Sequence, residues 1–205
     1  MVENQIRVIQ KKLVFDGYFK VIRYRLVHGL FAGGDGPEIS REIFERGRAV
    51  AVLPYDPQRD EVVLIEQFRP GALGIAAHPW LIETIAGIVE PGEGIKDVAR
   101  REAKEEAGLE LQELEPVISY FASPGGSTET VDLFVARMNA SAAGGLFGLA
   151  EEGEDIKVHV LSSDQAFSWL SEGRIKVATA IIALQWLLLN RERLRTAWSS
   201  GREDA

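Results

Sequence analysis

The sequence predicts an α+β fold in which helices cover a mixed β-sheet. Segments rich in Val, Ile, Tyr and Phe come first, followed by one helix, further strands and two C-terminal helices. Strand and helix do not alternate regularly and no internal repeat is found, which argues against a doubly wound parallel sheet. The chain has 205 residues, of which 46% are hydrophobic, and this is enough for one globular domain of ordinary core size.

Strands dominate the first half of the chain. They are predicted at residues 6–13, 18–27, 49–54, 61–68 and 80–85. The pair Asp16-Gly17 between the first two strands indicates a hairpin. The other strands are separated by segments rich in Gly, Pro or small and polar residues, at 29–38, 56–60 and 70–79.

The second half begins with a predicted helix at 95–107, and Gly108 ends it in the position of a C-terminal cap. Three more strands are expected, at 117–122, 132–137 and 156–161. Two helices are expected, at 163–172 and 177–194. The segment 141–155 is rich in Gly and Glu and is predicted to be a mobile loop.

The composition excludes several classes of partner. The net charge is −8, with acidic residues clustered at 83–115 and 151–155, which is the wrong sign for a broad nucleic-acid interface. No apolar run reaches the roughly 18 residues that span a bilayer, and the N-terminal residues lack the apolar core of a signal peptide. The chain has no cysteine, which permits a reducing compartment, so we expect a cytoplasmic protein without a membrane partner.

Glutamates in the helix at 95–107 are predicted to face inward. At about 100° per residue, one stripe of this helix holds the apolar residues Val98, Ala99 and Ala103. Beside that stripe, and not opposite it, lie three glutamates, Glu102, Glu105 and Glu106. An ordinary solvated acidic face would place them on the far side of the helix.

Three inward carboxylates within two turns would repel one another unless a cation neutralised them. Clustered carboxylate oxygens are ligands that suit Mg²⁺ or Mn²⁺. Arg101, four residues before Glu105, can hold that carboxylate in place. The turn at 91–94 can aim Glu93 at the same centre. The helix therefore indicates a divalent-metal site.

The same residues match the signature of the Nudix hydrolase family position for position. The signature is Gly, five residues, Glu, seven residues, and then the run Arg-Glu-apolar-x-Glu-Glu-x-Gly-apolar. Its fixed positions in this chain are Gly87, Glu93, Arg101, Glu102, Ala103, Glu105, Glu106, Gly108 and Leu109. So many fixed positions make a chance match very improbable.

The resemblance implies a strand–loop–helix box, at 87–109, within an αβα sandwich. It implies that Glu102 and Glu106 are the principal metal ligands, together with the backbone carbonyl of Ala86. Glu93 would assist in holding the metal. Glu105, positioned by Arg101, would assist in catalysis.

Outside the box the chain resembles the ADP-ribose pyrophosphatase branch of this family. The likeness is carried by the stretches at 41–69, 122–129 and 148–160, and by Pro124, which stands about fifteen residues after the box. It implies hydrolysis of ADP-ribose to AMP and ribose 5-phosphate, with two or three Mg²⁺ ions in the site, or Mn²⁺ in their place.

The resemblance also implies roles residue by residue. Arg69 and Glu129 would contact the phosphate and terminal ribose region of the substrate. Tyr18 and Arg41 would hold the adenine from the N-terminal strands of a second subunit, since an aromatic ring and a planar guanidinium suit a purine.

The general base would come from the acidic loop that ends the predicted segment 141–155. The resemblance favours Glu152, and its neighbours Glu151 and Glu154 remain alternatives. A base on a loop is physically sensible, because the loop can close over bound substrate and exclude water.

Two alternative functions stay open. A related Nudix hydrolase could act on another nucleoside diphosphate sugar, such as GDP-mannose, because pocket shape decides this choice. A non-catalytic Nudix regulator could instead sense ADP-ribose. Such a module would not need the complete acidic set and usually carries a basic DNA-binding segment, neither of which fits this chain.

The N-terminal strands favour a homodimer. The strands in residues 1–45 have no obvious cover of their own, and exposed strand edges invite pairing with a second copy. We therefore predict that 1–45 serves dimerisation and the adenine site, and that 46–205 is the hydrolase domain.

Overall fold

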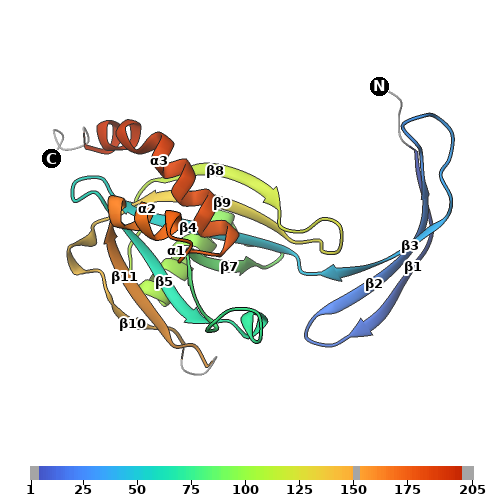
Figure 1. Cartoon of the computed structure of the whole chain (residues 1–205), viewed down its shortest axis with the longest axis horizontal. Helices are drawn as coiled ribbons and strands as arrows, with labels where there is room; N and C mark the ends of the chain where they lie inside the picture. The colour runs from blue at the N-terminus through green and yellow to red at the C-terminus, as the bar shows by residue number, and fades with distance from the viewer. Residues whose placement is uncertain (1–4, 150–152, 200–205) are drawn as a thin grey trace. The chain divides into compact units, whose positions relative to one another are not determined.

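The structure is a computed structural model, and it describes residues 5–149 and 153–199. Contacts between residues divide the chain into two units. One consists of Met1–Arg48 and Tyr120–Val131, and the other of Ala49–Ser119 and Asp132–Ala205. Each unit contains its own β-sheet (Figure 1).

The first unit contains a three-stranded antiparallel sheet of β1 (Ile6–Asp16), β2 (Lys20–His28) and β3 (Ile39–Glu45), in that order. The predicted hairpin at Asp16-Gly17 is confirmed, because β1 and β2 pair with Asp16 opposite Lys20. The predicted loop at 29–38 connects β2 to β3. β1 extends beyond its predicted end at residue 13, whereas β2 begins two residues later and ends one residue later than predicted.

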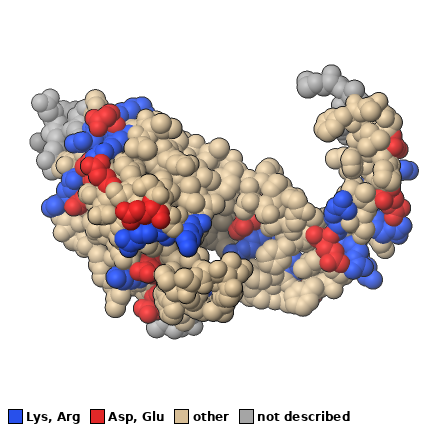
Figure 2. Space-filling view, in the orientation of Figure 1, with Lys and Arg blue, Asp and Glu red and all other residues tan. Residues whose placement is uncertain are grey.

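β1 is an edge strand that exposes apolar side chains. Its exposed large hydrophobic residues are Ile6, Val8, Ile9, Leu13 and Phe15. In the part of the chain that the structure describes, no strand pairs with the outer edge of β1. Elsewhere on this sheet acidic and basic side chains lie next to each other (Figure 2). An unpaired edge with apolar side chains is typical of a surface that associates with another chain.

The second sheet has eight strands, which include β4 (Arg48–Asp56), β5 (Glu61–Phe68), β6 (Trp80–Glu83), β7 (Ile85–Val89), β8 (Leu114–Phe121), β9 (Thr130–Arg137), β10 (Gly145–Phe147) and β11 (Ile156–Ser162). Its central path has the order β10-β11-β5-β4-β9-β8, while β6 pairs with β5 and β7 pairs with β4. β5, at the bounds predicted from its apolar run, lies inside the sheet and is buried along most of its length.

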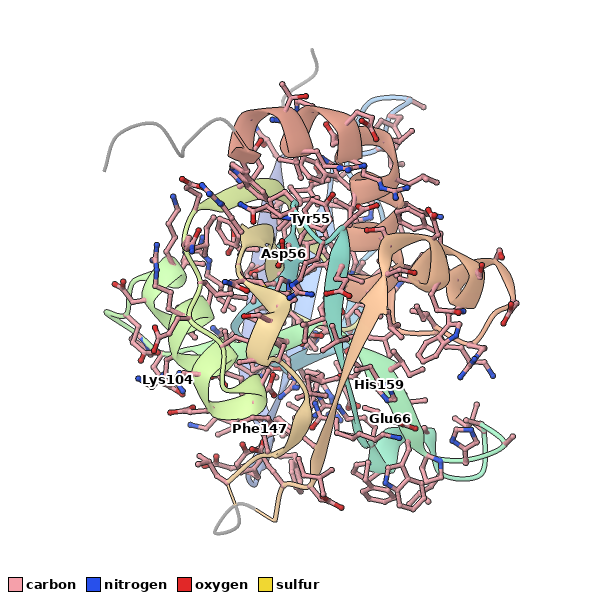
Figure 3. All side chains as sticks on the ribbon, turned by 90° about the vertical axis from the view of Figure 1, so that its left-hand side faces the viewer. Tyr55, Asp56, Glu66, Lys104, Phe147 and His159 are labelled. Carbon is pink, nitrogen blue, oxygen red and sulfur yellow. The ribbon has the colours of Figure 1, made fainter. Side chains whose placement is uncertain are left out.

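Helices cover both faces of this sheet. Successive residues of a strand point to opposite faces of the sheet. On one face, Val52 of β4 and Val63 of β5 belong to one core cluster with Val98 of α1 (Ile95–Ala107). On the other face, Tyr55 of β4 lies against Trp198 of α3 (Ala178–Ser199), with ring centroids 6.4 Å apart. α2 (Ser163–Ser171) also covers this face, and Figure 3 shows α1 on one side of the sheet with α2 and α3 on the other. The predicted αβα sandwich is confirmed.

α3 is fastened to the turn between β4 and β5. The carboxylate of Asp60 accepts hydrogen bonds from Arg191 Nε at 2.9 Å, Tyr55 Oη at 2.8 Å and Ser163 Oγ at 3.1 Å. Burial alone would raise the pKa of Asp60, but these hydrogen bonds outweigh it and lower the pKa.

Among the described helices, none combines the length and the apolar composition that a membrane span requires.

Apart from shifted ends, as in β8 and α3, two predicted elements differ from the structure. The strand predicted at 80–85 is two strands, because the chain leaves β5 after Glu83 and pairs with β4 from Ile85 onwards. The segment 141–155 is not a loop throughout, since it contains β10, which pairs with β11 at the edge of the sheet. Both errors have one cause: strand pairing is a long-range contact that the local composition does not reveal.

Burial along α3 predicts a sharp contrast in stability between two leucines. Leu187 is fully buried and Leu189 is 84% exposed. We expect Leu187→Ala to lower the free energy of unfolding by about 2–5 kcal/mol, because it leaves a cavity in the core. Leu189→Ala, as the matched control, should change it by less than about 1 kcal/mol. Urea denaturation measures both, and equal losses would contradict this assignment of the buried face.

Candidate active site

The box begins with a tight turn between β7 and α1. The backbone N–H of Glu93 donates to the carbonyl of Glu90 at 3.1 Å, and Glu90 N–H donates to Glu93 Oε2 at 2.8 Å. Gly92 has φ 95°, a left-handed conformation that glycine adopts with little strain. The carboxylate of Glu93 is therefore held by its own turn, at the exposed N-terminal end of α1.

The end of α1 follows the prediction. Gly108 has φ 64°, its N–H donates to the carbonyl of Lys104 at 3.0 Å, and the N–H of Leu109 donates to that of Ala103 at 2.9 Å. A Cβ at Gly108 would lie 2.5 Å from Cε1 of Phe147, so both the backbone conformation and the space require glycine here.

The faces of α1 agree with the helical wheel. Val98, Ala99 and Ala103 are buried, as is Glu106, which is only 4% exposed. The remaining charged side chains at 96, 97, 100 and 104 are exposed. Of the three glutamates predicted to face inward, Glu106 lies deepest, while Glu102 and Glu105 are partly exposed.

Glu106 is a carboxylate inside the protein. Its Oε2 accepts a hydrogen bond from the backbone N–H of Ala86, on β7, at 3.1 Å. Burial raises the pKa of Glu106 to about 8; the Ala86 bond lowers it, while the charges of Glu102 and Glu154 raise it further. A carboxylate in this environment is costly to ionise unless a cation is near.

Glu102 lies one turn earlier on the same side of α1. A Cβ added to Gly87 would lie 2.0 Å from Glu102 Oε1, so the missing side chain at Gly87 is what allows the carboxylate to approach β7. Arg101 Nη1 lies 3.0 Å from Glu102 Oε1 and donates to Glu105 Oε2 at 3.1 Å, which is the pairing predicted for Glu105. Burial nevertheless raises the pKa of Glu102 to about 7.

Glu154 belongs electrostatically to the same group. Its charge acts on Glu102, Glu106 and Arg69, and its own Oε2 accepts a hydrogen bond from Leu149 N–H at 3.2 Å. The predicted base Glu152, like Glu151, lies outside the described residues. Of the three acidic residues predicted as the base, Glu154 is the one that lies within the described residues.

Arg69 is positioned by a residue that the sequence did not single out. Its guanidinium forms a two-pronged contact with the buried carboxylate of Glu83, with Nη2 and Oε2 2.8 Å apart. The charges of Glu106 and Glu154 also act on Arg69, which places it in the same group as the box glutamates. An isolated Glu in the apolar strand WLIE was the available signal for Glu83.

The remaining predicted substrate residues belong to the first unit. Tyr18 is 88% exposed beside the turn of the hairpin. Arg41 lies on β3 opposite Tyr24 of β2, and its Nη1 donates to the carbonyl of Ser40 at 2.8 Å. Glu129 lies 3.4 Å from Arg46 Nε. Their predicted contacts with substrate stay predictions.

The described side chains supply some, but not all, of the ligands that a divalent cation needs. The described ranges contain no group of three His, Cys, Asp or Glu side chains that could hold a metal ion. They do contain Glu102 and Glu106, two neighbouring carboxylates on one helix face whose pKa values are both raised by burial. A cation between them would remove their repulsion and favour the ionised form, so the pair fits a hard metal ion such as Mg²⁺.

Comparison with known proteins identifies the family. Residues 45–181 match the family model described as the NUDIX domain. This range contains the whole of α1 and the strands β4 to β11 of the second sheet. The chain belongs to the Nudix family.

Relatives with near full-length similarity carry two kinds of name. The chain is 48% identical over 197 residues to the ADP-ribose pyrophosphatase of Escherichia coli strain K12, covering 96% of this chain and 94% of the relative. It is 44% identical over 202 residues to the ADP-ribose pyrophosphatase of Haemophilus influenzae, covering 96% and 92%. Similarity to the GDP-mannose pyrophosphatase of an Enterobacter species is lower, at 34% identity over 194 residues, covering 91% and 96%.

A solved structure shares the fold. It is titled crystal structure of ADP compounds hydrolase, and it superposes with a TM-score of 0.69, covering 97% of each chain. At 20% identity this likeness supports the architecture alone.

The close approach at Gly87 predicts the effect of one methyl group. Gly87→Ala should push Glu102 away from β7 and weaken Mg²⁺ binding by about tenfold or more, since metal affinity depends on ligand orientation. Gly71→Ala is the control, because no atom lies within 4 Å of a Cβ built there. Calorimetric titration with Mg²⁺ tests this, and unchanged affinity in Gly87→Ala would refute the assigned approach.

Burial of Glu106 predicts how stability depends on pH when divalent metal is removed. Since the pKa of Glu106 rises from 4.5 to about 8 on folding, the folded chain binds more protons than the unfolded chain in this interval. The contribution of Glu106 to stability therefore falls as pH rises from about 5 to 8. In EDTA, the free energy of unfolding of Glu106→Gln should fall less steeply with pH than that of the wild type. Parallel curves from chemical denaturation would contradict the buried position.

Proposed function

We propose that the chain hydrolyses ADP-ribose to AMP and ribose 5-phosphate in a reaction that depends on Mg²⁺. The support from comparison is the higher identity to ADP-ribose pyrophosphatases, 48% and 44%, than to a GDP-mannose pyrophosphatase, 34%, at similar coverage. The observation that carries the proposal is the carboxylate pair of the partly buried Glu102 and the buried Glu106, of which Glu106 bonds Ala86 N–H and interacts with the charge of Arg69.

The metal would be held by Glu102, Glu106 and the backbone carbonyl of Ala86, with Glu93 assisting from the turn. Two or three Mg²⁺ ions, or Mn²⁺ in their place, would supply charge neutralisation for the pyrophosphate and would lower the pKa of the attacking water. Arg101 would keep Glu105 aligned through the contact that already exists at 3.1 Å.

A carboxylate of the acidic loop would accept the proton of the attacking water. Glu152 is the first candidate, and it lies outside the described residues. Glu154 is the alternative, and its charge already acts on both metal-binding glutamates. Glu151 completes the set. A carboxylate is an adequate base at neutral pH when the water that it deprotonates has a lowered pKa.

Substrate recognition would use two arginines together with polar and aromatic groups. Arg69 would contact a phosphate, and its pairing with Glu83 keeps the guanidinium in one orientation before substrate arrives. Arg41 and Tyr18 would hold the adenine, and Glu129 would contact the terminal ribose region. Because Glu129 pairs with Arg46 in the first unit, ribose hydroxyls would compete with or join that contact.

A homodimer through the first unit completes the proposal. The outer edge of β1 and its apolar side chains are the surface that would pair with a second copy. In such a dimer Tyr18 and Arg41 would serve the site of the partner subunit, which would explain why they are exposed in the single chain.

The central test is the carboxylate that lies deepest. Glu106→Gln should lower kcat for ADP-ribose by about 100-fold or more at saturating Mg²⁺ and change KM little, because the lost charge acts mainly on the transition state. Glu110→Gln is the control, since Glu110 is exposed and pairs with Lys104 at 3.1 Å. Near-normal turnover of Glu106→Gln would contradict the role of Glu106 as a metal ligand.

The choice of base and substrate follows from the same assay. Of Glu152→Gln and Glu154→Gln, the variant that loses more kcat marks the base. Products from ADP-ribose, ADP-glucose, GDP-mannose and NADH separate ADP-ribose hydrolysis from action on another nucleotide sugar. ADP-ribose binding without any Mg²⁺-dependent product would instead favour the non-catalytic regulator.

The dimer has its own test. Light scattering should give the mass of two chains for the wild type. Paired substitutions Val8→Lys and Leu13→Lys should give a single chain with lower activity, because charges would enter the β1 surface. Leu146→Lys, at an exposed apolar position of β10, is the control and should leave the mass unchanged. A monomeric wild type with full activity would refute the dimer.

A further inference from the structure

The second unit contains a cavity on the face of its sheet opposite α1. The volume is about 310 Å³, at the lower end of small-molecule sites. Glu66 of β5 and His159 of β11 line it. Their strand neighbours Ile65 and Val158 belong to the core cluster that includes α1, so residues 66 and 159 point to the α2 side. The cavity is therefore separated from the carboxylate helix by the sheet.

Three lining side chains, Glu66, His159 and Arg174, are connected through Trp169, which does not itself line the cavity. Glu66 Oε2 lies 2.8 Å from His159 Nε2, and Figure 3 shows these two side chains next to each other. The His159 ring stands edge-on to Trp169 of α2, with centroids 5.6 Å apart. The guanidinium carbon of Arg174 lies 3.8 Å from the centroid of the Trp169 ring. The indole thus holds both a hydrogen-bonding pair and a cation in place.

Two cations at this cavity have no anionic partner in the described ranges. Arg174 and Lys176 both line it, both are exposed, and neither side chain has a carboxylate within ion-pair distance among those residues. Two cations that line one concave surface attract an anion such as a phosphate.

The other lining groups suit an uncharged, hydroxylated body. The Glu66–His159 pair can donate to and accept from sugar hydroxyls, and Trp80, which is 48% exposed, offers an aromatic surface for the apolar side of a ring. An inorganic anion would be repelled by the carboxylate of Glu66, and a free sugar would lack the charge attraction of the two cations.

We propose that this cavity binds a small sugar phosphate, as a site separate from the catalytic one. Arg174 and Lys176 contact the phosphate, and Glu66 and His159 bond the hydroxyl groups. The ligand lies against Trp80.

The cavity shares a loop with the catalytic side of the sheet. Ala76, Ala77 and His78 line it, and the next residue, Pro79, accepts a hydrogen bond from the backbone N–H of Arg69 at 2.8 Å. The side chain of Arg69 is bonded to Glu83 among the site groups. A ligand that orders residues 76–78 therefore acts one hydrogen bond away from Arg69, and its binding alters turnover.

Calorimetric titration with glucose 6-phosphate in EDTA tests the site. The wild type and Glu106→Gln should bind equally, while the double variant Arg174→Ala/Lys176→Ala should bind at least tenfold more weakly. Lys96→Ala/Arg100→Ala, which removes two exposed cations from α1, is the charge-matched control and should bind like the wild type. Loss of binding in Glu106→Gln but not in Arg174→Ala/Lys176→Ala would move the ligand to the catalytic site and overturn the proposal, as would no binding to the wild type.

Two further measurements separate a sugar-phosphate site from a plain anion site. Glu66→Gln should weaken glucose 6-phosphate and leave inorganic phosphate unchanged; equal affinity of the two probes would overturn the sugar part. Glucose 6-phosphate should change kcat or KM for ADP-ribose by at least twofold in the wild type and in Lys96→Ala/Arg100→Ala, but not in Arg174→Ala/Lys176→Ala. Binding without this change would overturn the link to turnover.

Discussion

Two carboxylates of like charge one turn apart on α1, Glu106 buried and Glu102 partly buried, are the constraint around which the second unit is arranged. Glu106 is inside the protein and reaches a backbone N–H of β7, while Glu102 needs the space left by Gly87 to come as close. Ionising both costs free energy, as the raised pKa values show. A cation bound between the two carboxylates would offset this cost, and the strand, turn and capped helix of the box fix the positions of both carboxylates.

Both cationic and anionic side chains surround Glu102 and Glu106. Arg101 pairs with Glu102 and with Glu105, whereas Arg69 pairs with Glu83. Glu154 adds a further negative charge from the acidic loop. The result is a site with more acid than base, which explains why a phosphorylated substrate would need metal between it and the protein.

The second sheet separates the carboxylate helix α1 from the cavity. One face carries the core cluster shared with α1, and the other carries α2, α3 and the cavity with Arg174 and Lys176. β5 contributes to both faces because its residues alternate: Ile65 packs toward α1, and Glu66 bonds His159 on the other side. The loop after β5 then joins the two, since it starts at Arg69 and lines the cavity before β6.

Local sequence determined the parts of this protein that depend on local interactions. The bounds of α1, its inward glutamates and the cap at Gly108 follow from helical periodicity and from glycine's freedom at positive φ, and the box signature pointed to the family. Tertiary structure alone decided the contacts between distant segments. These are the switch of strand partners after Glu83, the pairing of Glu83 with Arg69, and the pairing of Glu66 with His159 across 93 positions. The physical reason is that strand order and register depend on which segments meet in space, and residues near in sequence carry little information about that choice.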